Sequence, residues 1–190
     1  MDANEIELVV RARKGEVEAF TALVERCWAR LVGFARSVVG DSEAEDCVQE
    51  SLVVVWEKLS SLRESAAFQS WALRIVARRC VRRARGRARF VPLSLVSEEA
   101  DPKSQGESEA LQVESVLALL PPRQRAVMHL TVVEGMTDSE IGAALAISPA
   151  SVRSHRRRAR ESLSPKFRQF RIVEDKEDAA AGRQEPGRSV

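Results

Sequence analysis

The chain of 190 residues lacks the features of an exported or membrane-spanning protein. No run of residues approaches the roughly 20 apolar positions that cross a bilayer. The N-terminus opens on the acids Asp2, Glu5 and Glu7 and has no apolar signal-peptide segment. Tyrosine is absent, and aromatic residues make up only 5% of the chain. We therefore expect a cytoplasmic protein without membrane insertion, in which abundant Ala, Leu, Glu and Arg favour helical bundles over a β-sandwich.

Side chains that carry catalysis or bind metals are equally scarce. The two histidines, His129 and His155, fall within predicted helices, far from any serine or aspartate constellation. Cys27, Cys47 and Cys80 are an odd number at wide spacing, which suits neither a disulfide framework nor the paired ligands of a zinc site. We expect each of the three cysteines to be a buried thiol with a structural role. We expect that the protein is not an enzyme and that it has no catalytic residue, no bound metal and no cofactor.

The net charge of +2 hides a strong segregation of charge. Residues 74–89 contain eight arginines and no acid, and residues 153–171 contain seven arginines, one lysine and one acid. Between these blocks, five acids in residues 98–109 face only Lys103. The alternative is a pair of solvated helical faces, but such faces usually carry mixed signs. Two basic blocks around an acidic segment indicate two surfaces for a nucleic acid.

Helical periodicity dominates the first half of the chain. It predicts helices over residues 20–39, 42–59 and 70–85, the first ended by Gly40 and the second opened by a capping box that starts at Ser42. Residues 91–108 have the composition of a flexible linker, and residues 174–190 that of a disordered tail. The sequence thus predicts an all-α fold of two small helical bundles, residues 10–90 and 109–168, joined by that linker.

The second bundle contains a helix-turn-helix pattern. A short helix starts at Thr137, Ala146-Ile147 forms the turn, and Ser148 and Pro149 are a good N-cap and first residue for the next helix. That helix has a buried stripe of Val152, Ala159 and Leu163 and an arginine-rich outer face. The alternative is an ordinary helical hairpin whose arginines serve solubility. A basic recognition helix for the major groove fits the ordered signals better.

A family resemblance rests on these segments taken in order. Residues 44–56, from Ala44-Glu45-Asp46 to Trp56, resemble the core-polymerase-binding helix of bacterial sigma factors, and the helix from Trp71 resembles their minus-10-reading helix. Residues 119–163 are similar to their minus-35-reading domain. The resemblance covers residues 15–165 without room for a middle domain, as in the extracytoplasmic-function (ECF) group. It implies RNA polymerase core and promoter DNA as partners, and an anti-sigma factor as a further one.

The resemblance implies three groups of functional residues. Those expected to bind core polymerase are Asp46, Gln49, Glu50, Val53 and Trp56. Those expected to recognise and melt the minus-10 element are Leu62, Phe68, Arg74, Arg78 and Arg82. Those expected to read the minus-35 element are Pro149, Ser151, Arg153, Ser154, Arg157, Arg158 and Arg160. Without the resemblance, Asp46 and Glu50 are better explained as acids favoured by the dipole in early helical turns. The alternative for Phe68 is core packing.

Four positions depart from the family pattern. Arg78 and Arg82 stand where the family often has Asn and Asp, which should raise general DNA affinity. Arg156 lies on the buried stripe, so we expect its stem to pack while its head reaches toward phosphate. Ala146 replaces the usual turn glycine, which predicts a turn that needs no positive φ.

The strongest alternative function is a transcriptional regulator of the response-regulator effector type, which does not join core polymerase. Its final helix resembles Val152-Arg153-Ser154-His155. Such proteins need a receiver domain with acids at strand ends, and the helical first half of this chain offers none.

Overall fold

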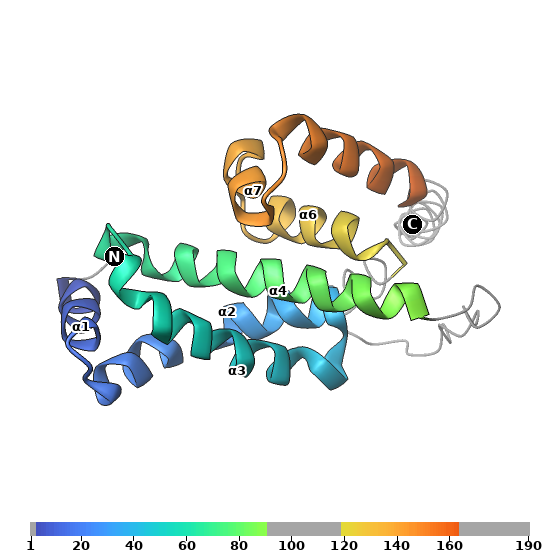
Figure 1. Ribbon diagram of the computed structural model, residues 1–190. Helices are drawn as coiled ribbons and strands as arrows, with labels where there is room; N and C mark the ends of the chain where they lie inside the picture. The colour runs from blue at the N-terminus through green and yellow to red at the C-terminus, as the bar shows by residue number, and fades with distance from the viewer. Residues whose placement is uncertain (1–2, 91–118, 164–190) are drawn as a thin grey trace, which may run out of the picture.

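The computed structural model describes residues 3–90 and 119–163, and all of their secondary structure is helical (Figure 1). The predicted linker, the predicted tail and residues 109–118 of the second predicted bundle lie outside these residues. The elements are α1 (Ala3–Arg13), α2 (Val17–Val39), α3 (Asp41–Lys58), the 3-10 turns η1 (Leu59–Ser61) and η2 (Ser65–Ala67), α4 (Phe68–Phe90), α6 (Pro122–Val132), α7 (Asp138–Leu145) and a last helix over residues 149–163. The all-α prediction is confirmed.

The first domain is built from α1 to α4. Helix α2 buries the stripe that its periodicity predicts, including Leu23, Leu31 and Phe34. Gly40 follows at φ 89°, and its N–H donates to the Arg36 carbonyl 3.0 Å away. Because Gly40 turns the chain in a single residue, α3 starts at Asp41 with Gly40 at its N-cap. The predicted capping box at Ser42 is therefore wrong, since Ser42 already lies inside the helix.

Helix α1 was not predicted from the sequence. It buries Leu8, Val9 and Ala12 among the core residues. Glu5 is also buried, and its carboxylate accepts a hydrogen bond of 3.0 Å from the Gln69 amide at the start of α4. The helix was missed because charged residues interrupt its apolar pattern, and its burial comes from packing against α2 and the turns η1 and η2.

Helix α4 lies in the middle of the molecule, with α2 and α3 on one side and α6, α7 and the last helix on the other (Figure 1). One continuous cluster of buried residues joins the two domains through it. Val76 and Ala77 of α4 belong to the same cluster as Leu130 of α6 and Ile141 and Ala144 of α7. The second domain therefore completes its core against the first.

Polar contacts accompany this packing. Arg30 of α2 donates to the Glu134 carboxylate at 2.7 Å, and Arg78 of α4 donates to the carbonyls of Ala143 and Ala144 at 2.6 and 2.8 Å. His129 of α6 meets Phe34 of α2 edge to face, with ring centroids 5.2 Å apart. Burial lowers the pKa of His129, which favours the neutral ring.

The helix-turn-helix forms with the caps that the sequence predicts. Thr137 and Glu140 make a reciprocal capping box at the start of α7. The Ser148 hydroxyl accepts a hydrogen bond of 3.1 Å from the Ser151 N–H at the start of the last helix. The turn between them is tight, because a Cβ atom on Gly142 would lie only 2.7 Å from the Ile147 carbonyl oxygen. Glycine is thus required at position 142.

The prediction for Ala146 is wrong. This residue ends α7 in the left-handed region at φ 53°, and it is the one non-glycine residue with positive φ among residues 3–90 and 119–163. The conformation brings the Ile147 N–H within 3.0 Å of the Gly142 carbonyl and closes the helix end. Alanine occupies the position at a conformational cost that glycine would not incur.

Replacement of Ala146 by glycine should stabilise the protein. We expect Ala146→Gly to raise the free energy of unfolding by about 0.5–1 kcal/mol, because relief of left-handed strain exceeds the entropy that glycine loses on folding. The matched control is Ala143→Gly on the exposed side of α7, which should lower it by about the same amount. Urea denaturation measures the free energy of unfolding of both variants. A loss of stability in Ala146→Gly as large as that in Ala143→Gly would contradict the account of the turn.

Candidate polymerase and nucleic-acid interfaces

The outer face of α3 carries the exposed part of the expected polymerase site. Asp46, Gln49 and Val53 are all exposed and recur at three- and four-residue steps, which places them on one helical face. Val53 is 58% exposed, which is high for a large apolar side chain. Trp56 is half-buried against Phe20, with ring centroids 4.9 Å apart. An exposed valine flanked by polar and acidic groups suits docking onto another protein.

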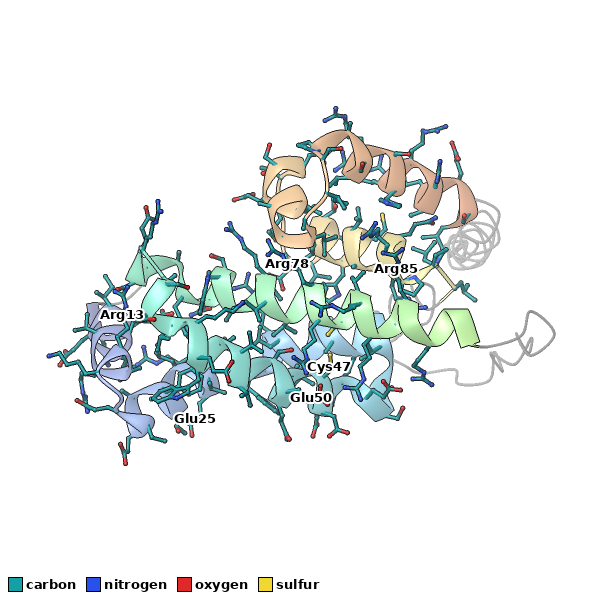
Figure 2. All side chains as sticks on the ribbon, in the orientation of Figure 1. Arg13, Glu25, Cys47, Glu50, Arg78 and Arg85 are labelled. Carbon is teal, nitrogen blue, oxygen red and sulfur yellow. The ribbon has the colours of Figure 1, made fainter. Side chains whose placement is uncertain are left out.

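Glu50 faces α4 as well as solvent. Its carboxylate accepts hydrogen bonds from Arg79 at 2.7 Å and from Arg83 at 3.3 Å (Figure 2 labels Glu50 beside Cys47). The bond from Arg79, helped by the charge of Arg83, lowers the pKa of Glu50. Glu43 pairs in the same way with Arg83 at 2.7 Å and with Arg87. Three arginines of the first basic block thus bind acids of α3, an arrangement that charge counting did not predict.

Arg78, Arg82 and Arg85 of α4 face the second domain. Arg78 and Arg85 are labelled on that side in Figure 2, and both line an open pocket of about 430 Å³ together with Arg82 and Arg123. Burial, and then the nearby Arg85 charge, lower the pKa of Arg123. None of the described residues that line the pocket is acidic, so this part of the chain gives the pocket a positive surface.

The remaining residues expected at the minus-10 site differ in exposure. Arg74 is half-buried, and its Nε has no hydrogen-bond partner. Leu62 and Phe68 are buried, with 4% and 0% of their surface exposed. Arg13 holds this region by donating to the carbonyls of Ser60, at 3.2 Å, and Leu62. The two apolar side chains therefore belong to the domain core in this arrangement.

The last helix has the two faces that its sequence predicts. Val152, Ala159 and Leu163 are buried at 0%, 0% and 3% exposure. The expected minus-35 residues Pro149, Arg153, Arg157, Arg158 and Arg160 are exposed, while Ser151 and Ser154 are half-buried. The helix therefore presents a basic outer face.

Asp138 of α7 organises part of that face, a role that no sequence pattern indicated. The Arg156 guanidinium lies 2.7 Å from the Asp138 carboxylate, so its head is paired inside the domain instead of reaching outward as we expected. Arg153 lies 3.7 Å from the same carboxylate but keeps 61% of its side chain exposed. Arg157 pairs with Glu161 at 3.0 Å, one turn along the helix.

Within residues 3–90 and 119–163, no three His, Cys, Asp or Glu side chains come together as a metal site. In the same ranges, no helix has the length and apolar content to cross a membrane.

Two family models match the chain. Residues 23–90 match sigma-70 region 2, and residues 110–163 match sigma-70 region 4. The match over residues 23–90 leaves no support for a receiver domain and thus for the response-regulator alternative.

Curated relatives carry the same description. The chain is 31% identical over 167 residues to the ECF RNA polymerase sigma factor SigM of Mycobacterium tuberculosis, covering 86% of this chain and 84% of SigM. It is 29% identical over 165 residues to the probable RNA polymerase sigma factor RfaY of Xanthomonas campestris, covering 80% of this chain. The chain spans only 41% of the length of RfaY.

Solved structures agree with these relatives. CnrH of Cupriavidus metallidurans, in complex with the cytosolic domain of CnrY, superposes with a TM-score of 0.61 at 27% identity, over 87% of this chain and 98% of that one. The sigma factor RpoE of Bartonella quintana, in complex with the anti-sigma factor NepR, superposes with a TM-score of 0.62 over 80% and 98% of the two chains. Its 23% identity supports the fold alone. The chain belongs to the sigma-70 family and is an ECF sigma factor, which directs RNA polymerase core to promoters.

Proposed function

We propose that three surfaces of this sigma factor divide the work of promoter recognition. The outer face of α3 binds core polymerase, α4 reads and opens the minus-10 element, and the last helix reads the minus-35 element. The domains that do so are residues 10–90 and 109–168, with residues 91–108 as their linker. The observation that carries the proposal is the exposed basic face of the last helix, opposite its buried stripe of Val152, Ala159 and Leu163.

Core polymerase binds the α3 face through Asp46, Gln49 and Val53, with Glu50 and Trp56 at its margin. The exposed valine supplies apolar contact area, and the polar neighbours supply hydrogen bonds and charge complementarity. Glu50 contributes less charge than its sequence position suggests, because Arg79 and Arg83 already neutralise it.

Minus-10 DNA binds along α4 at Arg74, Arg78 and Arg82, and Leu62 and Phe68 form the wall beneath the pocket for an extruded base. In the packed arrangement Arg78 is held by two carbonyls of α7. A phosphate cannot use those N–H groups at the same time. Promoter binding therefore requires the second domain to leave α4, which also frees the last helix to reach a distant element.

The remaining properties follow from this role. The chain acts as a cytoplasmic DNA-binding subunit without catalytic chemistry of its own. An anti-sigma protein is a further partner, by analogy with the complexes of CnrH and RpoE. Such a partner would act by covering the α3 face or by holding the two domains together.

The polymerase surface can be tested by charge reversal. Asp46→Arg should reduce co-purification with bacterial core polymerase at least tenfold and abolish the transcripts that the wild-type chain starts when core enzyme and genomic DNA are added. The matched control is Glu25→Arg, the same charge change at an exposed position of α2. Both variants should keep the wild-type thermal midpoint. Undiminished core binding by a folded Asp46→Arg variant would remove α3 from the proposal.

The recognition helix can be tested by separating base contacts from phosphate contacts. Arg153→Ala or Arg157→Ala should cost about 1–3 kcal/mol of promoter affinity and relax selectivity at one minus-35 position. Arg160→Ala should weaken binding to all sequences and flatten its salt dependence. Titration of promoter variants at several salt concentrations distinguishes these results. If all three variants behave as phosphate contacts, this helix does not read the minus-35 sequence.

A further inference from the structure

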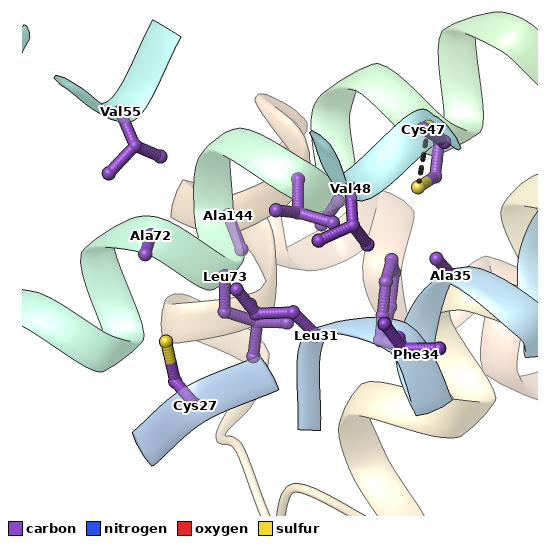
Figure 3. Packing of buried hydrophobic residues seen from close by; sticks show 14 of the residues in the cluster. Cys27, Leu31, Phe34, Ala35, Cys47, Val48, Val55, Ala72, Leu73 and Ala144 are labelled. Atoms are coloured by element: carbon purple, nitrogen blue, oxygen red, sulfur yellow. Dashed lines mark hydrogen bonds between the residues drawn. The ribbon is translucent and has the colours of Figure 1, made fainter. Parts of the chain in front are cut away.

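Two cysteines that are distant in sequence meet inside the first domain. Cys47 of α3 and Cys80 of α4 have no exposed surface, and their Sγ atoms lie 3.1 Å apart. The dashed line at Cys47 in Figure 3 marks this contact. The two sulfurs of a disulfide lie about 2.05 Å apart, so the Sγ atoms need to approach each other by roughly 1 Å to form a covalent bond.

We propose that Cys47 and Cys80 are a redox modification site, at which a peroxide forms a reversible disulfide between α3 and α4 in the folded protein. Cys27, which is also buried, remains a thiol under the same conditions and serves as an internal control.

The surroundings of the pair favour Cys47 as the attacking sulfur. The hydrogen bond from Cys80, together with the charges of Arg83 and Arg79, lowers the pKa of Cys47 to about 7 although burial acts in the opposite direction. A lowered pKa raises the thiolate fraction of Cys47, and the thiolate is the reactive form.

Cys27 has a contrasting environment. Burial raises its pKa to about 11. Its thiol points along its own helix, 3.4 Å from the Leu23 carbonyl and 3.5 Å from that of Val24. Cys27 is therefore protonated near neutral pH and bonded to its own backbone.

The reaction balances with hydrogen peroxide as the oxidant. The Cys47 thiolate attacks one peroxide oxygen, the O–O bond breaks, and a proton accompanies the departing oxygen as water, leaving a sulfenic acid. The Cys80 thiol then attacks the sulfenic sulfur, which forms the S–S bond and releases the second water. Two thiols and one peroxide thus give one disulfide and two waters, with two electrons passing from sulfur to oxygen.

Surface ion pairs next to the thiols provide a route for the oxidant. Glu50, Arg79 and Arg83 bridge α3 and α4 beside the pair, and their side chains are 49%, 38% and 31% exposed. Exposed ion pairs of this kind are weak and exchange readily with water. When these side chains part, a molecule as small as hydrogen peroxide can reach Cys47.

The cross-link should stabilise the first domain. It joins positions 33 residues apart and so restricts the unfolded chain. On the proposed function, α3 also binds core polymerase beside Cys47, so an oxidant would act within the polymerase-binding helix. The formation of the cross-link does not depend on that role.

The test uses the full-length reduced chain treated with hydrogen peroxide under native conditions, then denatured and alkylated with N-ethylmaleimide. We expect one alkylated cysteine in place of three, a Cys47–Cys80 peptide in the digest, and a higher urea midpoint that dithiothreitol reverses. Cys27→Ala should still form the cross-link, whereas Cys80→Ala and Cys80→Ser should not. Circular dichroism checks that each variant is folded.

Two results of this experiment would contradict a redox site at Cys47 and Cys80. Three alkylated cysteines in the folded chain, under peroxide conditions that cross-link the urea-unfolded chain, would overturn the proposal. So would a disulfide that includes Cys27. Neither readout involves polymerase, so a failure here is distinct from a failure of the Asp46→Arg experiment.

Discussion

The hydrogen bonds from Arg78 to the end of α7 determine how this molecule can work. The last carbonyls of a helix lack partners within it and carry partial negative charge. Arg78 satisfies two of them, at Ala143 and Ala144, beside the apolar contacts of α4 with α6 and α7. The same guanidinium is a candidate ligand for minus-10 phosphate. One side chain therefore links the packed arrangement to DNA binding, because it can serve only one partner at a time.

The arginines of this chain have different surroundings, which a count of arginines in the sequence does not reveal. Arg79, Arg83 and Arg87 bind acids of α3, and Arg156 binds Asp138. Their charges are largely neutralised within the protein and add little to DNA affinity. Arg158 and Arg160 remain exposed on the last helix, and Arg82 and Arg85 on α4. On the proposed function, these exposed groups and the exposed Arg153 and Arg157 of the last helix form the positive surface that a nucleic acid meets.

Local features could be predicted from the sequence, and distant ones could not. Three predicted features depend on neighbours within a few residues and were confirmed: the helix start at Thr137, the cap at Ser148 and the stripe of Val152, Ala159 and Leu163. The packing of α7 on α4, the pairing of Cys47 with Cys80 and the anchor at Asp138 depend on contacts between distant segments. The error at Ala146 is of a third kind, because closure of the helix end in the tight turn overrode the conformational preference of a single residue.

The claim that the two domains separate to bind a promoter is tested most directly by a distance measurement. Spin labels can be placed at Lys14 and Ser162, both exposed and in different domains, through unnatural amino acids that leave the native cysteines intact. The free chain should give one narrow distance distribution, and addition of core polymerase and promoter DNA should shift that distribution. An unchanged distribution in an initiation-competent complex would contradict the claim that α4 must be uncovered before it binds DNA.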